Sequence, residues 1–127
     1  MNILIVDDHA GMRALIRDIV GATATQIREC ASGEEAVSLC RSFSPDCVTM
    51  DLRMGAMHGL AAVQYIRQMH PAANIVIVTQ FDHDKLRDRA QRVGADGFVT
   101  KDNLPTLKRY IELLAAADSQ ALPDTFT

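Results

Sequence analysis

Several apolar runs of the sequence end abruptly at a polar residue that a buried segment would not be expected to contain. The polar residues that follow these runs are Asp7, Asp8, Asp51, Thr79 and Lys101. Each of them alone has an ordinary explanation: an Asp after a strand often caps a helix, a Thr often lies in a turn, and a Lys is often a solvated surface charge. Their joint placement at the ends of successive runs is what indicates chemistry.

Three carboxylates in one pocket repel one another unless one is protonated or a cation lies among them. All the ligands here would be oxygen atoms, which favours Mg²⁺ over zinc or copper. Lys101 would add a second positive charge and Thr79 a neutral hydroxyl donor. Such a set compensates the charge that develops on a phosphoryl group during transfer. Asp51 would be the nucleophile, because a carboxylate can carry a covalent phosphoryl group.

The runs that carry these residues are short, apolar and without polar alternation, which is the pattern of strands buried on both faces. The predicted strands cover residues 3–6, 27–31, 47–50, 75–78 and 97–100. Apolar residues at helical spacing between them predict helices over about residues 12–20, 33–40, 60–69, 82–92 and 104–117, with Asp82 capping the fourth.

Alternating strands and helices of this kind form an α/β fold, with a parallel sheet and helices on both of its faces. Ligands bind such open sheets beyond the carboxyl ends of the strands. If the first and third strands are neighbours there, the three carboxylates that follow them converge in one small pocket.

Length and composition are those of one ordinary globular domain. The chain has 127 residues, 48% of them hydrophobic and 23% charged, and we expect a domain over residues 1–117 and a frayed tail or linker stub over residues 118–127. A net charge of -3 argues against direct nucleic-acid binding. No apolar run predicts a signal peptide or membrane span. Cys30, Cys40 and Cys47 are expected to be reduced core residues of a cytoplasmic protein.

Five sequence motifs resemble the receiver domains of two-component response regulators. They are ILIVDDH, MRALIRDIV, VTMDLRM, IVIVTQF and GADGFVTK, and the resemblance extends from residue 2 to about residue 116. It implies a doubly wound five-stranded parallel sheet with strand order 2-1-3-4-5 and flavodoxin-like topology. The second of these motifs is similar to that of chemotaxis-type receivers.

The resemblance also implies a role for each site residue. Asp51 would accept a phosphoryl group from a sensor histidine kinase or phosphotransfer protein, with Lys101 and Thr79 assisting. Asp7, Asp8, Asp51 and the backbone carbonyl of Arg53 would bind Mg²⁺. Thr79 and Phe98 would form a switch pair. The chain would then be a signalling switch and not an enzyme, and an output domain or target protein would bind the face made by the fourth helix, fifth strand and fifth helix.

Three positions depart from the pattern of these receivers. Gly55 stands where Pro is usual, which predicts a more mobile loop over the site. Gln80 replaces a small residue and is expected to shield or contact the phosphoryl group. Asp102 replaces a Pro that follows the Lys in a cis peptide, so we predict a trans bond, because a cis bond without Pro costs about 2.5–4 kcal/mol.

The fourth predicted helix is basic, with Lys85, Arg87, Arg89 and Arg92. It is either a solvated face or a docking face for an acidic partner. His9, next to the acidic pair, is expected to be a solvated residue of the first helical turn.

Two other functions are considered. A Mg²⁺-dependent phosphatase would also use Asp51 as its nucleophile, but such enzymes usually have a second Asp at the position of Arg53. A flavodoxin-like electron carrier would need a phosphate-binding Gly/Ser/Thr loop after the first strand, where Asp7 and Asp8 would repel a cofactor phosphate.

Overall fold

The computed structural model describes residues 1–52, 59–116 and 121–126. Within them the chain forms one five-stranded sheet with strand order β2-β1-β3-β4-β5, and every neighbouring pair is parallel. The strands are β1 (Asn2–Val6), β2 (Gln26–Cys30), β3 (Cys47–Met50), β4 (Asn74–Thr79) and β5 (Gly97–Thr100). The predicted fold class and strand order are confirmed, and each strand lies within one residue of its predicted position.

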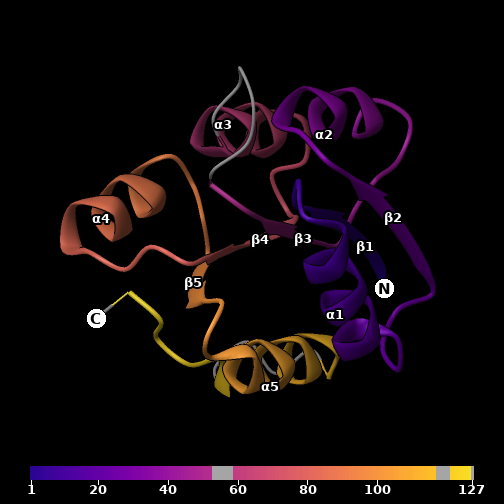
Figure 1. Ribbon diagram of the computed structural model, residues 1–127. Coiled ribbons are helices and arrows are strands. Elements are labelled where there is room, and N and C mark those ends of the chain that lie inside the picture. Colours follow the sequence, from indigo (N-terminus) through magenta and orange to yellow (C-terminus); the bar gives the residue numbers. More distant parts are fainter. Residues whose placement is uncertain (53–58, 117–120, 127) are drawn as a thin grey trace.

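Helices cover both faces of the sheet (Figure 1). Their bounds are α1 (Ala10–Val20), α2 (Gly33–Leu39), α3 (Gly59–Met69), α4 (Asp84–Arg92) and α5 (Leu104–Ala115). One buried cluster contains residues of α2, α3 and α4, and a second contains residues of α1 and α5. The molecule therefore has three layers, as doubly wound sheets do.

The two clusters explain why the inner strands show no polar alternation. Successive side chains of a strand point to opposite faces, and along β1 Leu4 and Val6 enter the first cluster whereas Ile3 and Ile5 enter the second. Both faces are covered by helices, so both sets of side chains must be apolar. The predicted reduced cysteines agree with this packing, since Cys30, Cys40 and Cys47 are buried free thiols.

Two helix starts differ from their prediction. His9 is exposed, as predicted, but it is the N-cap of α1 and not a residue of the first turn, and its Nδ1 accepts a hydrogen bond of 3.2 Å from the Met12 N–H. Asp82 does not cap α4; His83 does. The Asp82 carboxylate instead accepts a 2.7 Å hydrogen bond from Arg87 Nε.

The predicted trans peptide bond between Lys101 and Asp102 is confirmed. Gly94 follows the end of α4 with φ 109°, a left-handed conformation that favours glycine. In the described ranges, none of the helices combines the length and apolar character needed to cross a bilayer.

Candidate functional site

The carboxyl ends of β1 and β3 bring the three aspartates together. The parallel ladder continues one residue beyond each strand: the Asp7 N–H donates to the Cys30 carbonyl at 3.1 Å, and the Asp51 N–H donates to the Val6 carbonyl at 2.9 Å. One carboxylate oxygen from each of Asp7, Asp8 and Asp51 lies within 4.8 Å of the other two. The predicted convergence of the acidic residues is confirmed.

Lys101 follows β5, the edge strand of the sheet, and its side chain reaches the acidic cluster. Its N–H donates to the Thr79 carbonyl at 2.8 Å, which orders the turn after β5. Its Nζ then lies 2.9 Å from Asp7 Oδ2 and 3.4 Å from Asp51 Oδ2. Burial disfavours the charged form of Lys101, but the two carboxylates outweigh burial and raise the pKa of the ammonium group. Lys101 therefore stays a cation beside Asp51.

The site has the features of a divalent-cation site. Asp7 is 1% exposed, and among the described residues its Oδ2 has an ion pair with Lys101 but receives no hydrogen bond of acceptable geometry. Among the described residues, the three carboxylates of the cluster are matched by one ammonium group, that of Lys101, so the cluster has two more negative than positive charges, whereas an ordinary ion pair is balanced. An all-oxygen set of this kind is typical of Mg²⁺ ligands.

Two backbone contacts around Asp7 were not predicted. The His9 N–H donates to Asp7 Oδ1 at 2.8 Å, and Arg13 Nη1 donates to the Asp7 carbonyl at 2.7 Å. Arg13 also lies 3.4 Å from Glu29. The helical spacing of Arg13 marks it only as a polar residue of α1, so the sequence carries no signal for these contacts.

A cavity of about 410 Å³ opens over the cluster. Among the described residues it is lined by Asp8, His9, Met12, Asp51, Gln80 and Lys101. Asp7 is not among the described residues that line it. Gln80 borders the cavity, in line with its predicted position near a bound group.

The remaining predicted residues lie outside this cluster. The Thr79 side chain is fully buried, its Oγ1 accepts a 3.3 Å hydrogen bond from the Phe81 N–H, and it is not among the described residues that line the cavity. Phe98 is 2% exposed and belongs to the hydrophobic cluster that contains residues of α2, α3 and α4. Arg53 and Gly55 lie outside the described residues.

Gly59 is a site residue that the sequence marked only as part of a loop. It begins α3 directly against Asp51: a Cβ at position 59 would lie 2.3 Å from the Asp51 carbonyl oxygen and 2.9 Å from the Leu52 Cα. Backbone atoms cannot move aside as a flexible side chain can. Glycine therefore lets α3 approach the residue that carries the central carboxylate.

The chain is similar to a large family of known proteins. The family model of the response regulator receiver domain matches residues 3–112. The chain belongs to this family. It is thus the receiver domain of a two-component system, a class of signalling switch and not a conventional enzyme.

Individual relatives agree with this assignment. The chemotaxis protein CheY of Thermotoga maritima is 34% identical over 114 residues, which cover 89% of this chain and 93% of that protein. The nitrate/nitrite response regulator NarL of Escherichia coli is 29% identical, and the match covers 99% of this receiver but 59% of NarL.

Solved structures show the same fold. A LuxR-family two-component response regulator from Aurantimonas sp. superposes with a TM-score of 0.83 and 34% identity, covering 91% of this chain and 85% of that one. CheY in the CheX–CheY–BeF3–Mg complex of Borrelia burgdorferi superposes with a TM-score of 0.80 and 26% identity, covering 90% of this chain and 89% of that one.

Proposed function

We propose that Asp51 accepts a phosphoryl group from a histidine kinase or a phosphotransfer protein, and that the charge added there changes the face which binds an output domain or target protein. One observation carries the proposal: the Asp51 carboxylate lies 3.4 Å from the Lys101 ammonium and within 4.8 Å of two further carboxylates, at the floor of an open cavity. The relative from Borrelia burgdorferi, whose complex includes BeF3 and Mg, supports it.

In the proposed step, a carboxylate oxygen of Asp51 attacks phosphorus of a phosphohistidine. The new O–P bond forms as the N–P bond breaks, and the electron pair stays on the imidazole nitrogen of the donor. Lys101 already lies beside the attacking carboxylate of Asp51. Its ammonium group would neutralise charge on the phosphoryl oxygens. The product is an acyl phosphate.

Asp7, Asp8, Asp51 and the Arg53 carbonyl would hold Mg²⁺, and the ion supplies positive charge at the phosphoryl oxygens when it is bound. Among the described residues, Asp7 is fixed for this role by the bonds from His9 and Arg13. Free buried thiols are typical of reducing compartments, which supports a cytoplasmic location.

The proposed switch runs through Thr79 and Phe98. Phosphorylation adds about -1.5 to -2 charge at Asp51, which attracts the Thr79 hydroxyl and Lys101. Both residues flank β5, since Thr79 pairs with Thr100 and Lys101 follows it. Movement of the two residues would alter the surface of α4, β5 and α5 around Phe98, and an allosteric coupling of this kind is typically worth about 1–3 kcal/mol.

Acetyl phosphate with Mg²⁺ tests the proposal. We expect one phosphoryl group per chain, measured by intact-protein mass, and no uptake by Asp51→Asn. Asp18→Asn, on the exposed side of α1, is the matched control and should react like the wild type. Uptake by Asp51→Asn would refute the assignment of the acceptor. Continuous release of phosphate over many turnovers would instead indicate the phosphatase alternative.

A further inference from the structure

The segment Ala121–Phe126 lies against the outer edge of the sheet. β5 is the last strand, so the edge that faces away from β4 offers unpaired backbone groups. The Phe98 N–H on this strand donates a 2.7 Å hydrogen bond to Thr125 Oγ1. Figure 1 shows the segment, in yellow, running from the side of α5 past β5 towards α4. The sequence predicted a tail or linker stub over residues 118–127, and the described part of that stretch makes these contacts.

The segment also contacts α4 and both hydrophobic clusters. Arg87 Nη1 donates a hydrogen bond to the Thr125 carbonyl, and its guanidinium lies 4.6 Å above the centre of the Phe98 ring. The Phe126 ring lies 6.3 Å from that of Phe98, tilted by 56°, a usual aromatic pair geometry. Leu122 packs on the α5 side and Phe126 on the α4 side.

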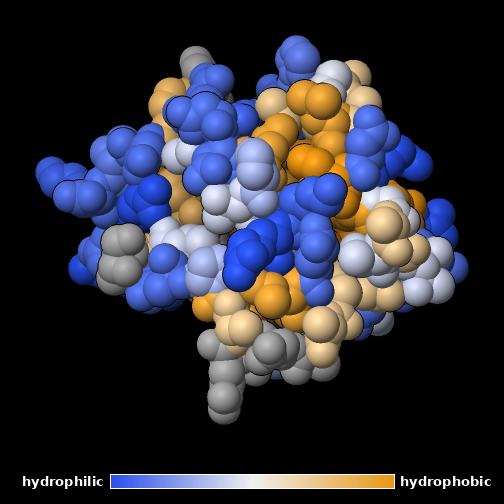
Figure 2. Space-filling view, turned by 90° about the horizontal axis from the view of Figure 1, so that it is seen from below, coloured by the Kyte–Doolittle hydropathy of each residue, from blue (hydrophilic) through white to orange (hydrophobic). Residues whose placement is uncertain are grey.

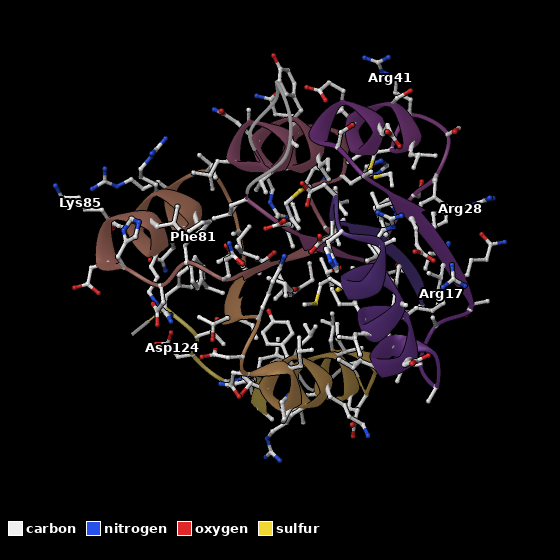
Figure 3. The ribbon with its side chains drawn as sticks, in the orientation of Figure 1. Arg17, Arg28, Arg41, Phe81, Lys85 and Asp124 are labelled. Atoms are coloured by element: carbon white, nitrogen blue, oxygen red, sulfur yellow. The ribbon has the colours of Figure 1, made fainter. Side chains whose placement is uncertain are left out.

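These contacts involve a backbone carbonyl, a hydroxyl and an aromatic ring of the segment, and Arg87 is the residue of α4 that binds the Thr125 carbonyl. The Arg87 charge already faces Asp82 at 2.7 Å. Lys85 points outward from α4 (Figure 3), and the left of the molecule in Figure 2 is largely hydrophilic. The occupied surface therefore fits a segment in which a hydroxyl residue is followed by an aromatic residue.

We infer that Ala121–Phe126 is an internal ligand of the α4–β5 edge, and that a partner of this face has to displace it. The role as a gate on output rests on the proposed function, because Phe98 and β5 belong to the proposed output face. The described contacts of the segment include two hydrogen bonds of Thr125, the pairing of the Phe126 and Phe98 rings and the packing of Leu122. Attachment to the same chain gives the segment an effective concentration of order millimolar. A partner with a larger interface can therefore displace it.

Amide hydrogen exchange of Phe98 tests the docking directly. In the full chain, Thr125→Val combined with Phe126→Ala removes the acceptor and the ring, so the Phe98 amide should exchange about tenfold faster or more, with the Val99 amide as the internal reference. Tyr65→Ala removes an aromatic ring that is 53% exposed on α3 and should leave Phe98 unchanged. Equal exchange rates in the double variant and the wild type would overturn the inference.

A peptide added in trans tests whether the surface recognises the segment. The peptide Ala-Leu-Pro-Asp-Thr-Phe at millimolar concentration should shift the amide resonances of Arg87 and Phe98 in the double variant and not in the wild type, where the segment already occupies the edge. Ala-Leu-Pro-Asp-Ala-Ala should shift neither. Equal shifts in both proteins, or none in the double variant, would show that the edge is not a site for this segment.

Neither measurement uses a phosphoryl group. If docking fails while Asp51 still takes up phosphate from acetyl phosphate, the inference is wrong and the proposed function stands. If docking is observed while Asp51 is inert, the proposed function is wrong and the segment is a structural strap. The double variant should accept phosphate on Asp51 as the wild type does, since Thr125 and Phe126 are not among the described residues lining the cavity.

Discussion

Lys101 is the residue on which the acidic cluster depends. Its Nζ contacts the carboxylates of Asp7 and Asp51, two groups that would also hold Mg²⁺. In the proposed mechanism, Lys101 and a bound Mg²⁺ would therefore compete for the same negative charge before phosphoryl transfer. After transfer both cations would be needed, because the phosphoryl oxygens bring additional negative charge.

We predict that Lys101→Met tightens Mg²⁺ binding about fivefold, since one nearby positive charge is lost, and that it slows phosphate uptake from acetyl phosphate. Mg²⁺ titration followed by NMR measures the first effect without any phosphoryl chemistry. Lys108→Met, an exposed position on α5, is the control and should match the wild type. Weaker Mg²⁺ binding by Lys101→Met would mean that the ammonium does not compete with the ion.

At the scale of elements, the start of α3 is fixed by its contact with the residue that ends β3. A Cβ on Gly59 would overlap the Asp51 carbonyl. We expect Gly59→Ala to lower the free energy of unfolding by about 1–3 kcal/mol and to slow phosphate uptake, because Asp51 must move. Urea denaturation measures the first effect.

Gly11→Ala is the matched glycine control. A Cβ at Gly11 would meet the His9 ring, at 3.0 Å. A side chain can shift more easily than a backbone carbonyl, although a shift of this ring weakens its N-cap hydrogen bond with Met12. Alanine also has the higher helix propensity. A Gly59→Ala variant as stable and as reactive as Gly11→Ala would contradict the importance of the close approach of α3.

β3 contains a buried hydroxyl with an unmet hydrogen bond. Thr49 is 1% exposed, and its Oγ1 has no partner among the described residues. Thr49→Val keeps the shape and removes the unpaired group, so we expect the free energy of unfolding to rise by about 1 kcal/mol. In Thr23→Val the lost hydroxyl donates to the Val20 carbonyl at 3.0 Å, and that variant should not be stabilised. Loss of stability in Thr49→Val would show that its hydroxyl is satisfied.

At the scale of the whole molecule, burial makes the fold sensitive to alkaline pH. Burial raises the pKa of the Cys30 and Cys47 thiols to about 12, that of Cys40 to about 11 and that of the Tyr110 hydroxyl to about 12. Between the unfolded and the folded pKa, the unfolded chain has lost protons that the folded chain keeps. Deprotonation therefore favours unfolding, and stability is present below about pH 9 and falls as pH rises.

Urea denaturation under reducing conditions at pH 8 and pH 10 checks this prediction. Each buried thiol contributes a fall of up to about 1.4 kcal/mol per pH unit above its unfolded pKa. Cys47→Ala removes one such group, and its stability should fall less steeply with pH, even though the cavity lowers its stability at pH 8. Equal slopes for the variant and the wild type would contradict the assignment.

The sequence by itself determined the layered fold and the members of the acidic cluster. Continuous apolar runs such as Ile3–Val6 encode burial on both faces, and parallel strands place their carboxyl ends at one edge. The resemblance to receiver domains implied the strand order, and with that order Asp7, Asp51 and Lys101 were expected to converge. Their spacing along the chain carries this information because each sits one residue beyond a strand.

Only the tertiary structure decided contacts between elements whose spacing carries no signal. His83, and not Asp82, caps α4, and the Asp82 carboxylate accepts a hydrogen bond from Arg87 instead. Arg87 in turn binds Thr125, far along the chain. Such pairings depend on how α4, β5 and the segment Ala121–Phe126 meet in space, and an edge strand with an unpaired N–H has many possible partners in the sequence. The acidic cluster was therefore predictable, whereas the occupant of the β5 edge was not.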